Sequence, residues 1–123
     1  MGAVTEVAVV PLKQADSIEL PNGSWSRMLV TSGKVDGNQS SLGYSVFTPG
    51  TVLSLVSHQT EEVAYVVSGS GELRLEDRVV AFEQGDALFI PPGTWHAVAN
   101  TGDEDVVMVF GFPYPEYPPT ERR

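Results

Sequence analysis

The stretch that decides the fold is residues 85–100, which read GDALFIPPGTWHAVAN. Two short runs rich in apolar residues, 87–90 and 96–99, lie on either side of a Pro-Pro-Gly sequence at 91–93. Proline fixes its own backbone angle and glycine tolerates positive φ, so this tripeptide is typical of a tight turn. The stretch therefore predicts two β-strands joined by a turn, with His96 at the start of the second strand.

The rest of the chain has the same organisation, in which short β-type runs are separated by Gly, Pro, Asn and Asp. Many short strands at intervals of roughly 8–12 residues are typical of an all-β sandwich or barrel. The expected strands cover residues 24–31, 42–48, 52–58, 62–68, 72–75, 79–82, 87–90, 96–99 and 105–112, with 19–22 as a candidate edge strand. The sequence therefore predicts an all-β fold with almost no helix.

The length of the chain, 123 residues, leaves room for one domain. We expect a single domain over residues 1–123, with the barrel at about 17–112. Residues 113–123, PYPEYPPTERR, carry several prolines, which cannot lie inside a sheet because they lack the N–H donor. This segment is expected to form an extended strap over the surface.

The charge balance excludes several classes of partner. Lys and Arg number 7 and Asp and Glu number 16, which gives a formal net charge of −9. Binding to nucleic acid or to an anionic membrane surface needs the opposite balance, so neither partner is expected. The absence of cysteine excludes disulfides, iron–sulfur clusters and a thiol nucleophile. The apolar runs are too short to cross a bilayer and the N-terminal segment lacks the features of a signal peptide, so a cytoplasmic location is expected.

The two histidines of the sequence, His58 and His96, are the natural starting point for a functional site. Glu62 begins one expected strand and His58 ends the preceding one, so the two side chains can lie close together if these strands pair across their corner. His96 begins a third strand. Two imidazoles and one carboxylate form an N, N, O ligand set that leaves coordination positions open. Such a set suits non-haem Fe(II), with other divalent ions as alternatives.

Two stretches of the chain resemble the two sequence motifs of the cupin superfamily. The first is residues 50–69, GTVLSLVSHQTEEVAYVVSG, in which Glu62 is followed by six residues and then Gly69. The second is residues 85–100, which match at every fixed position of the motif: Gly85, Pro91, Gly93, His96 and Asn100. The resemblance implies a single-domain, cupin-type double-stranded β-helix, also called a jelly-roll barrel. It also implies a homodimer, because cupins commonly pair through their outer strands.

The chain departs from the first cupin motif at Val56, where the motif has its leading histidine. The usual cupin set of three histidines and one glutamate is therefore reduced to His58, Glu62 and His96. This set is similar to that of cupin-type iron enzymes that bind metal through two histidines and one carboxylate. The resemblance implies one divalent metal ion, Fe(II) first, with Mn(II), Ni(II) and Zn(II) as alternatives. In a second interpretation metal binding has been lost and a histidine acts as an acid–base group.

The residues expected to line the pocket are mostly apolar. An apolar pocket favours a small, carbon-rich ketone, hydroxy acid or phenol over a phosphorylated substrate. Arg27 has two interpretations, an anchor for an anionic group or a surface ion pair, and Tyr44 is either a lining or a core residue. The expected pocket residues are Val52, Ser54, Val56, Ala64, Val66, Val98, Tyr44 and Arg27.

These observations lead to three hypotheses for function. The first is a metal-dependent enzyme with an oxygenase-type reaction on a small substrate that chelates the metal. The second is a non-oxidative lyase, isomerase or cyclase acting on a carbonyl compound, in which Glu62 or a histidine moves a proton and is the catalytic group. The third is a non-catalytic module that binds or senses a small molecule, because a fold does not determine a function.

Overall fold

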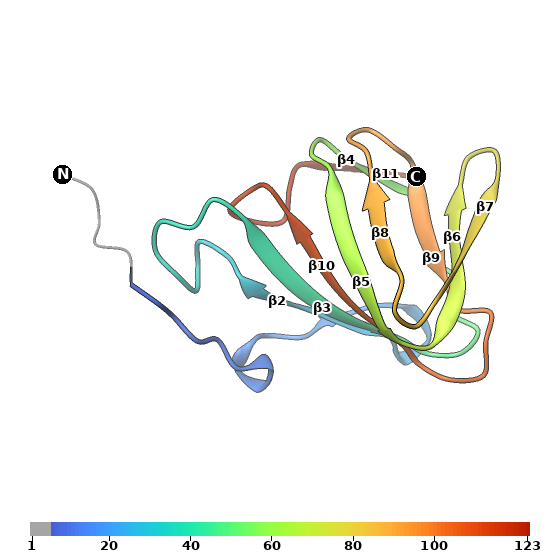
Figure 1. Ribbon diagram of the computed structural model, residues 1–123, viewed down its shortest axis with the longest axis horizontal. Helices are drawn as coiled ribbons and strands as arrows, with labels where there is room; N and C mark the ends of the chain where they lie inside the picture. The colour runs from blue at the N-terminus through green and yellow to red at the C-terminus, as the bar shows by residue number, and fades with distance from the viewer. Residues whose placement is uncertain (1–5) are drawn as a thin grey trace.

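Two antiparallel β-sheets pack face to face and enclose the core between them (Figure 1). The computed structural model describes residues 6–123. The larger sheet has six strands in the order β1 (Ile18–Glu19), β2 (Trp25–Val30), β3 (Ser41–Phe47), β10 (Val106–Phe112), β5 (Glu62–Ser68) and β8 (Ala87–Ile90). The smaller has five strands in the order β11 (Thr120–Arg122), β4 (Val56–His58), β9 (His96–Ala99), β6 (Ser70–Leu75) and β7 (Val79–Glu83). The all-β, double-stranded β-helix fold predicted from the sequence is confirmed.

Helical structure among residues 6–123 is confined to two short 3-10 turns, η1 (Leu12–Gln14) and η2 (Pro21–Gly23). Neither has the length or the hydrophobicity that a helix needs to cross a membrane. The candidate edge strand at 19–22 begins earlier than expected, as β1, because η2 occupies Pro21–Gly23.

The expected strand at 52–58 is shorter in the structure than the sequence pattern suggests. Only Val56–His58 forms regular strand, as β4, and Val52 makes an isolated bridge with Ala99. The backbone between them is irregular, so the strict alternation assumed for the whole run does not hold. This irregularity changes which of the residues before β4 face the barrel interior.

The C-terminal strap lies only partly outside the sheets. Its prolines precede Thr120, and the last residues form β11, which pairs with β4 along its edge. Thr120 lies opposite His58, and Arg122 lies opposite Val56. Because no proline falls within β11, the strand can complete its backbone hydrogen bonds, and the tail becomes a wall of the barrel.

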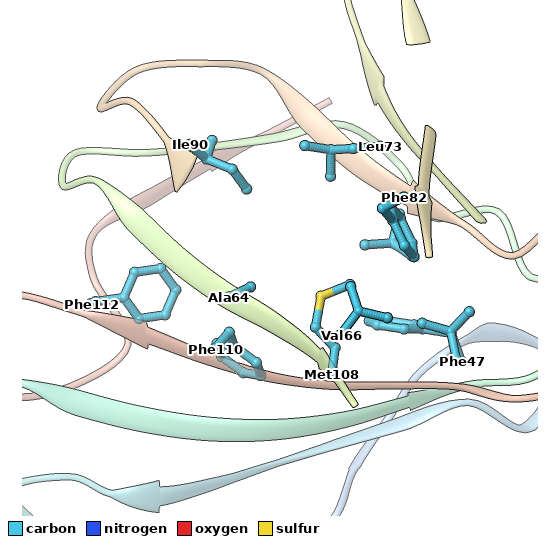
Figure 2. Close-up of a cluster of buried hydrophobic side chains, with 11 residues drawn as sticks. Phe47, Ala64, Val66, Leu73, Phe82, Ile90, Met108, Phe110 and Phe112 are labelled. Carbon is cyan, nitrogen blue, oxygen red and sulfur yellow. The ribbon is translucent and has the colours of Figure 1, made fainter. Parts of the chain in front are cut away.

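The hydrophobic core follows from the alternation of side chains along the strands. In β3, for example, every second residue from Ser41 to Phe47 is buried, and the residues between them are more exposed. Figure 2 shows side chains from both layers pointing toward one another across the barrel. Burial of each large apolar side chain contributes roughly 1.5–3 kcal/mol, so this cluster is the main source of stability. The cluster contains Phe47, Ala64, Val66, Leu73, Phe82, Ile90, Val98, Val106, Met108, Phe110 and Phe112.

Gly69 makes the corner at which the chain leaves β5 and enters β6 in the other sheet. Its φ of 85° lies in the left-handed region that glycine adopts without strain. A Cβ added at this position would lie 2.4 Å from the carbonyl oxygen of Asp105. The corner therefore requires glycine for its backbone conformation and also for its space.

Candidate metal centre

Three side chains from three strands converge in the barrel interior: His58 from β4, Glu62 from β5 and His96 from β9. Oε1 of Glu62 lies 3.2 Å from Nε2 of His58 and 3.2 Å from Nε2 of His96. The two histidines are 4% and 5% exposed. Potential ligand atoms of the three residues all lie within 4.8 Å of one another. Three separate strands therefore bring together the ligand set expected from the sequence.

The way His58 meets Glu62 differs from the expectation that their strands pair. β4 and β5 belong to different sheets, and residues 59–61 carry the chain across from one to the other. His58 and Glu62 therefore face each other across the interior, close to the corner that joins the two layers. In the smaller sheet, His96 reaches the same point because β9 is the neighbour of β4.

Hydrogen bonds on the far side of each imidazole fix which ring nitrogen carries the proton. The Thr120 hydroxyl donates its only proton to the carbonyl oxygen of Pro118 at 2.8 Å. With the hydroxyl proton directed at Pro118, the Thr120 oxygen, 2.7 Å from Nδ1 of His58, accepts a hydrogen bond from that nitrogen. Nδ1 of His96 in turn donates to the carbonyl oxygen of Thr94 at 2.8 Å. In the neutral rings both Nε2 atoms consequently present lone pairs toward Glu62.

The donor set fits a divalent cation. Two imidazole lone pairs and a carboxylate oxygen repel one another unless a positive charge lies among them. The outer hydrogen bonds to Thr120 and Thr94 are those that orient metal-binding histidines in proteins. His58, Glu62 and His96 would therefore hold the ion, and the two threonines would orient the imidazoles.

Without a cation, the site favours an added proton. Burial alone would raise the pKa of Glu62, but its interactions with the imidazoles of His58 and His96 lower it below its ordinary value. Burial alone would lower the pKa of His96, but the hydrogen bond to Glu62 and that to the Thr94 carbonyl raise it above its ordinary value. Both shifts favour an imidazolium paired with a carboxylate, a charge arrangement that a metal ion would replace.

Aromatic rings enclose the His58 imidazole. Phe112 and Tyr117 meet it edge to face, with ring centroids 5.0 Å and 5.3 Å away. Burial and the nearby charge of Glu62 raise the pKa of Tyr117, so its hydroxyl stays protonated and able to donate a hydrogen bond. The contributions of Tyr117 and Thr120 are not predictable from the sequence, because both residues lie in the strap and no local pattern indicates that the strap pairs with β4.

The three residues border a cavity of about 650 Å³ between the two sheets. Its walls are largely apolar, and they include the core residues Leu73, Ile90 and Met108. Four residues expected in the pocket line this cavity: Ser54, Val56, Ala64 and Val98. Ser26 and Ser45, which share a hydrogen bond of 2.6 Å, add two polar side chains to the lining, and neither was predicted from the sequence.

The other four residues expected in the pocket lie elsewhere. Val66 is fully buried in the core, and Val52 is 49% exposed because the irregular backbone after it breaks the alternation. Tyr44 and Arg27 occupy the outer face of the larger sheet, since Ser26, Met28 and Ser45 from the same strands line the cavity.

On that outer face Tyr44 and Arg27 both contact Trp25. The Tyr44 ring stacks on that of Trp25 at 5.9 Å. The guanidinium carbon of Arg27 lies 4.7 Å from the Trp25 ring centre, and its Nη1 donates to the Leu12 carbonyl oxygen at 3.1 Å. Neither residue is positioned to contact a ligand in the cavity.

Comparison with known families gives a match to the family described as "Cupin domain" over residues 43–112, a range that contains all three candidate ligands. A protein of Methanocaldococcus jannaschii described as uncharacterized is 30% identical over 97 residues, which are 78% of this chain and 77% of that protein. The Streptomyces cyaneus protein named polyketide synthase CurC is 33% identical over 68% of this chain and 55% of its own length.

A third relative is a 5-nitrosalicylic acid 1,2-dioxygenase of Bradyrhizobium sp., 30% identical over 54% of this chain and 32% of that protein. The chain thus spans about half of CurC and about a third of the dioxygenase. Among solved structures, the polyketide cyclase RemF from Streptomyces resistomycificus matches with a TM-score of 0.79 at 21% identity, over 95% of this chain and 85% of that one. That likeness supports the fold.

Proposed function

Because the chain belongs to the cupin domain family, we propose that it is a metal-dependent cupin enzyme whose small, mostly apolar substrate chelates the metal through oxygen. The observation that carries this proposal is the convergence of His58, Glu62 and His96 beside an apolar cavity. The orientation of both imidazoles, with Nε2 directed toward Glu62, adds to it. Val56, in place of a fourth ligand, leaves room for substrate oxygens.

Fe(II) is the proposed ion, with Mn(II), Ni(II) and Zn(II) as alternatives. A set of two histidines and one carboxylate is typical of non-haem Fe(II) oxygenases. When bound, such an ion supplies Lewis acidity to a chelated oxygen and a centre for oxygen chemistry.

The residues of the chain bind and orient the substrate. The apolar walls exclude water, which strengthens each charge interaction inside the cavity. The protonated Tyr117 hydroxyl can donate a hydrogen bond to a substrate oxygen near the ligands. The Ser26 and Ser45 hydroxyls offer a second polar contact on the larger sheet. A flat phenolic, keto or hydroxy-acid molecule meets these requirements.

We propose an oxygenase-type reaction, supported by the ligand set and by the relative named as a dioxygenase. A non-oxidative cyclisation is the second candidate, supported by the relative named as a polyketide synthase and by the cyclase among the similar structures. In that reaction Glu62 or a histidine would move a proton between substrate carbon and oxygen.

The test begins with metal content and continues with turnover. Wild-type protein is expected to bind about one equivalent of Fe(II), and His96→Ala and Glu62→Gln to lose it, since two ligands hold a divalent ion poorly against water. Glu61→Gln is the matched control, because it removes the neighbouring carboxylate, which is outside the ligand set. Unchanged metal content in His96→Ala would show that the site is elsewhere.

Turnover then separates the reactions. Fe(II)-loaded protein is given phenols, hydroxy acids and 1,3-dicarbonyl compounds with and without O₂. Oxygen uptake that depends on both the substrate and His96 supports the oxygenase. Conversion that proceeds equally without O₂ supports the cyclase instead. Tight binding of the same compounds with no conversion identifies a binding module.

A further inference from the structure

Two cationic side chains, Arg122 and Arg123, border the largely apolar cavity, and both come from the C-terminal strap. Arg123 is already engaged, because its Nη1 lies 2.5 Å from Glu76 Oε2 and its guanidinium lies 4.0 Å from the Trp95 ring centre. Arg122, by contrast, has no carboxylate within 4.0 Å among residues 6–123. In a chain with a net charge of −9, a cation without such a partner beside a cavity needs an explanation.

The strand register places Arg122 relative to the ligands. Arg122 lies opposite Val56 in β4, and Val56 lies opposite His96 in β9. Neighbouring strands are about 4.8 Å apart, so the backbones of Arg122 and His96 are roughly 10 Å apart across the sheet. Thr120, two residues before Arg122, contacts Nδ1 of His58, so both β11 side chains point to the same side of the sheet.

The surroundings of the guanidinium suit an anionic oxygen. Arg122 and Tyr117 both line the cavity, and the positive charge of Arg122 acts to lower the pKa of the Tyr117 hydroxyl, against the raising effects of burial and Glu62. Arg122 itself is exposed, so it lies where the cavity meets solvent. A planar guanidinium binds a carboxylate through two parallel hydrogen bonds, and a neighbouring hydroxyl can supply a third.

We propose that Arg122, assisted by the Tyr117 hydroxyl, forms an anion subsite that selects substrates bearing a carboxylate away from their chelating oxygens. This inference rests on the proposed function, since it assumes that the other end of the substrate reaches His58, Glu62 and His96. The chelating end and the carboxylate are then separated by an apolar spacer about as wide as one aromatic ring. The acidic protein repels anions in general, so a local cation is required to accept this one.

The test uses two probes, 3,4-dihydroxybenzoate and its methyl ester, of which only the first carries a negative charge on its carboxyl group at neutral pH. Both carry the same pair of chelating hydroxyls, and only the acid has a carboxylate for Arg122. Their affinities are measured by calorimetry on Zn(II)-loaded protein, in which no oxygen chemistry competes. The acid is expected to bind wild-type protein about tenfold more tightly than the ester.

Arg122→Gln is expected to reduce the affinity for the acid to that for the ester and to leave the ester unaffected. Arg122→Lys should keep part of the preference, and Arg123→Gln, the matched control, should keep all of it. Equal affinities of the two probes for wild-type protein would overturn the proposal. An equal loss of affinity for both probes in Arg122→Gln would also overturn it.

A further variant separates this proposal from the proposed function. In His96→Ala, loss of chelation should lower the affinities for both probes by the same factor and leave the preference for the acid in place. If His96→Ala leaves both affinities unchanged, chelation is wrong, while the preference that depends on Arg122 still supports the anion subsite.

Discussion

On each imidazole of the site, the position of a single proton decides whether a cation can be bound. Thr120 and Thr94 hold that proton on Nδ1 of His58 and of His96, respectively. Thr120 can do so only because Pro118 accepts its hydroxyl proton. The Thr120 hydroxyl, which lies on the far side of the ring from the site, thus determines whether Nε2 of His58 can bind a cation.

Replacing Thr120 tests this role. Thr120→Val keeps the shape of the side chain but removes the acceptor, so metal affinity should fall about tenfold or more. Thr120→Ser keeps the hydroxyl and should bind metal nearly as well as wild-type protein. Competition with a chromogenic chelator measures the affinities, and melting of the metal-free proteins reports any general loss of structure. Equal metal affinity of the Val and Ser variants would contradict the role.

Val56 offers a second test among single residues. It lines the cavity two residues before His58 and lies directly opposite His96. Val56→His should therefore add a fourth ligand and tighten metal binding by about tenfold or more. The added imidazole should at the same time weaken binding of catechol-type chelators by occupying their position. Metal affinity equal to that of wild-type protein would show that residue 56 does not reach the ion.

Among the elements, regular strands and sharp corners could be predicted from the sequence, and irregular segments could not. The bounds of β5, β8 and β9 agree with the sequence pattern, because clear turn residues flank each strand. The pattern failed before β4, where an irregular backbone leaves Val52 exposed. It also could not determine which face of β2 and β3 points inward, since both faces carry apolar residues and only packing of the sheets decides between them.

The corner at Gly69 can be tested against a corner without crowding. Gly85 has a similar φ of 92°, but a Cβ there would have no neighbour within 4 Å. Gly85→Ala should cost only backbone strain, about 1–3 kcal/mol of unfolding free energy. Gly69→Ala should cost roughly 1–3 kcal/mol more, because its Cβ also collides with Asp105. Urea denaturation at equilibrium measures both, and equal losses would show that Gly69 is required for conformation alone.

In the whole molecule, the pairing of β11 with β4 is the feature that was least predictable from the sequence. The two strands are far apart in the chain, and the prolines before β11 suggested a segment outside the sheets. Tyr117, Thr120 and Arg122 therefore could not be assigned to the site in advance.

The predicted homodimer stays a prediction, although the outer face of the larger sheet exposes Val63, Tyr65 and Phe89.

The buried charges make the stability of the metal-free protein depend on pH. The lowered pKa of Glu62 contributes stability above its ordinary value of 4.5, and this is lost as pH falls through the folded value. The raised pKa of His96 contributes stability below its ordinary value of 6.5, and this is lost as pH rises through the folded value. The advantage of wild-type protein over Glu62→Gln should therefore be largest between pH 4.5 and 6.5.

Melting temperatures of chelator-treated wild-type protein and Glu62→Gln across this range measure the effect. Metal-loaded protein serves as the contrast, because ligand nitrogens must lose their protons before they bind an ion. The melting temperature that wild-type protein gains on metal loading should increase with pH. This increase should fall in the range in which the advantage of metal-free wild-type protein over Glu62→Gln declines. A wild-type advantage that does not vary with pH would contradict the pairing of Glu62 with His96.

Glu62 belongs to one sheet, and His58 and His96 belong to the other. An ion held by all three would act as a cross-link between the two layers. Separation of the layers during unfolding would then require a coordination bond to break first, which slows unfolding more than it speeds folding. The lifetime of the protein would accordingly follow the supply of metal. Copies that lose their ion would open soonest and be removed first by proteases.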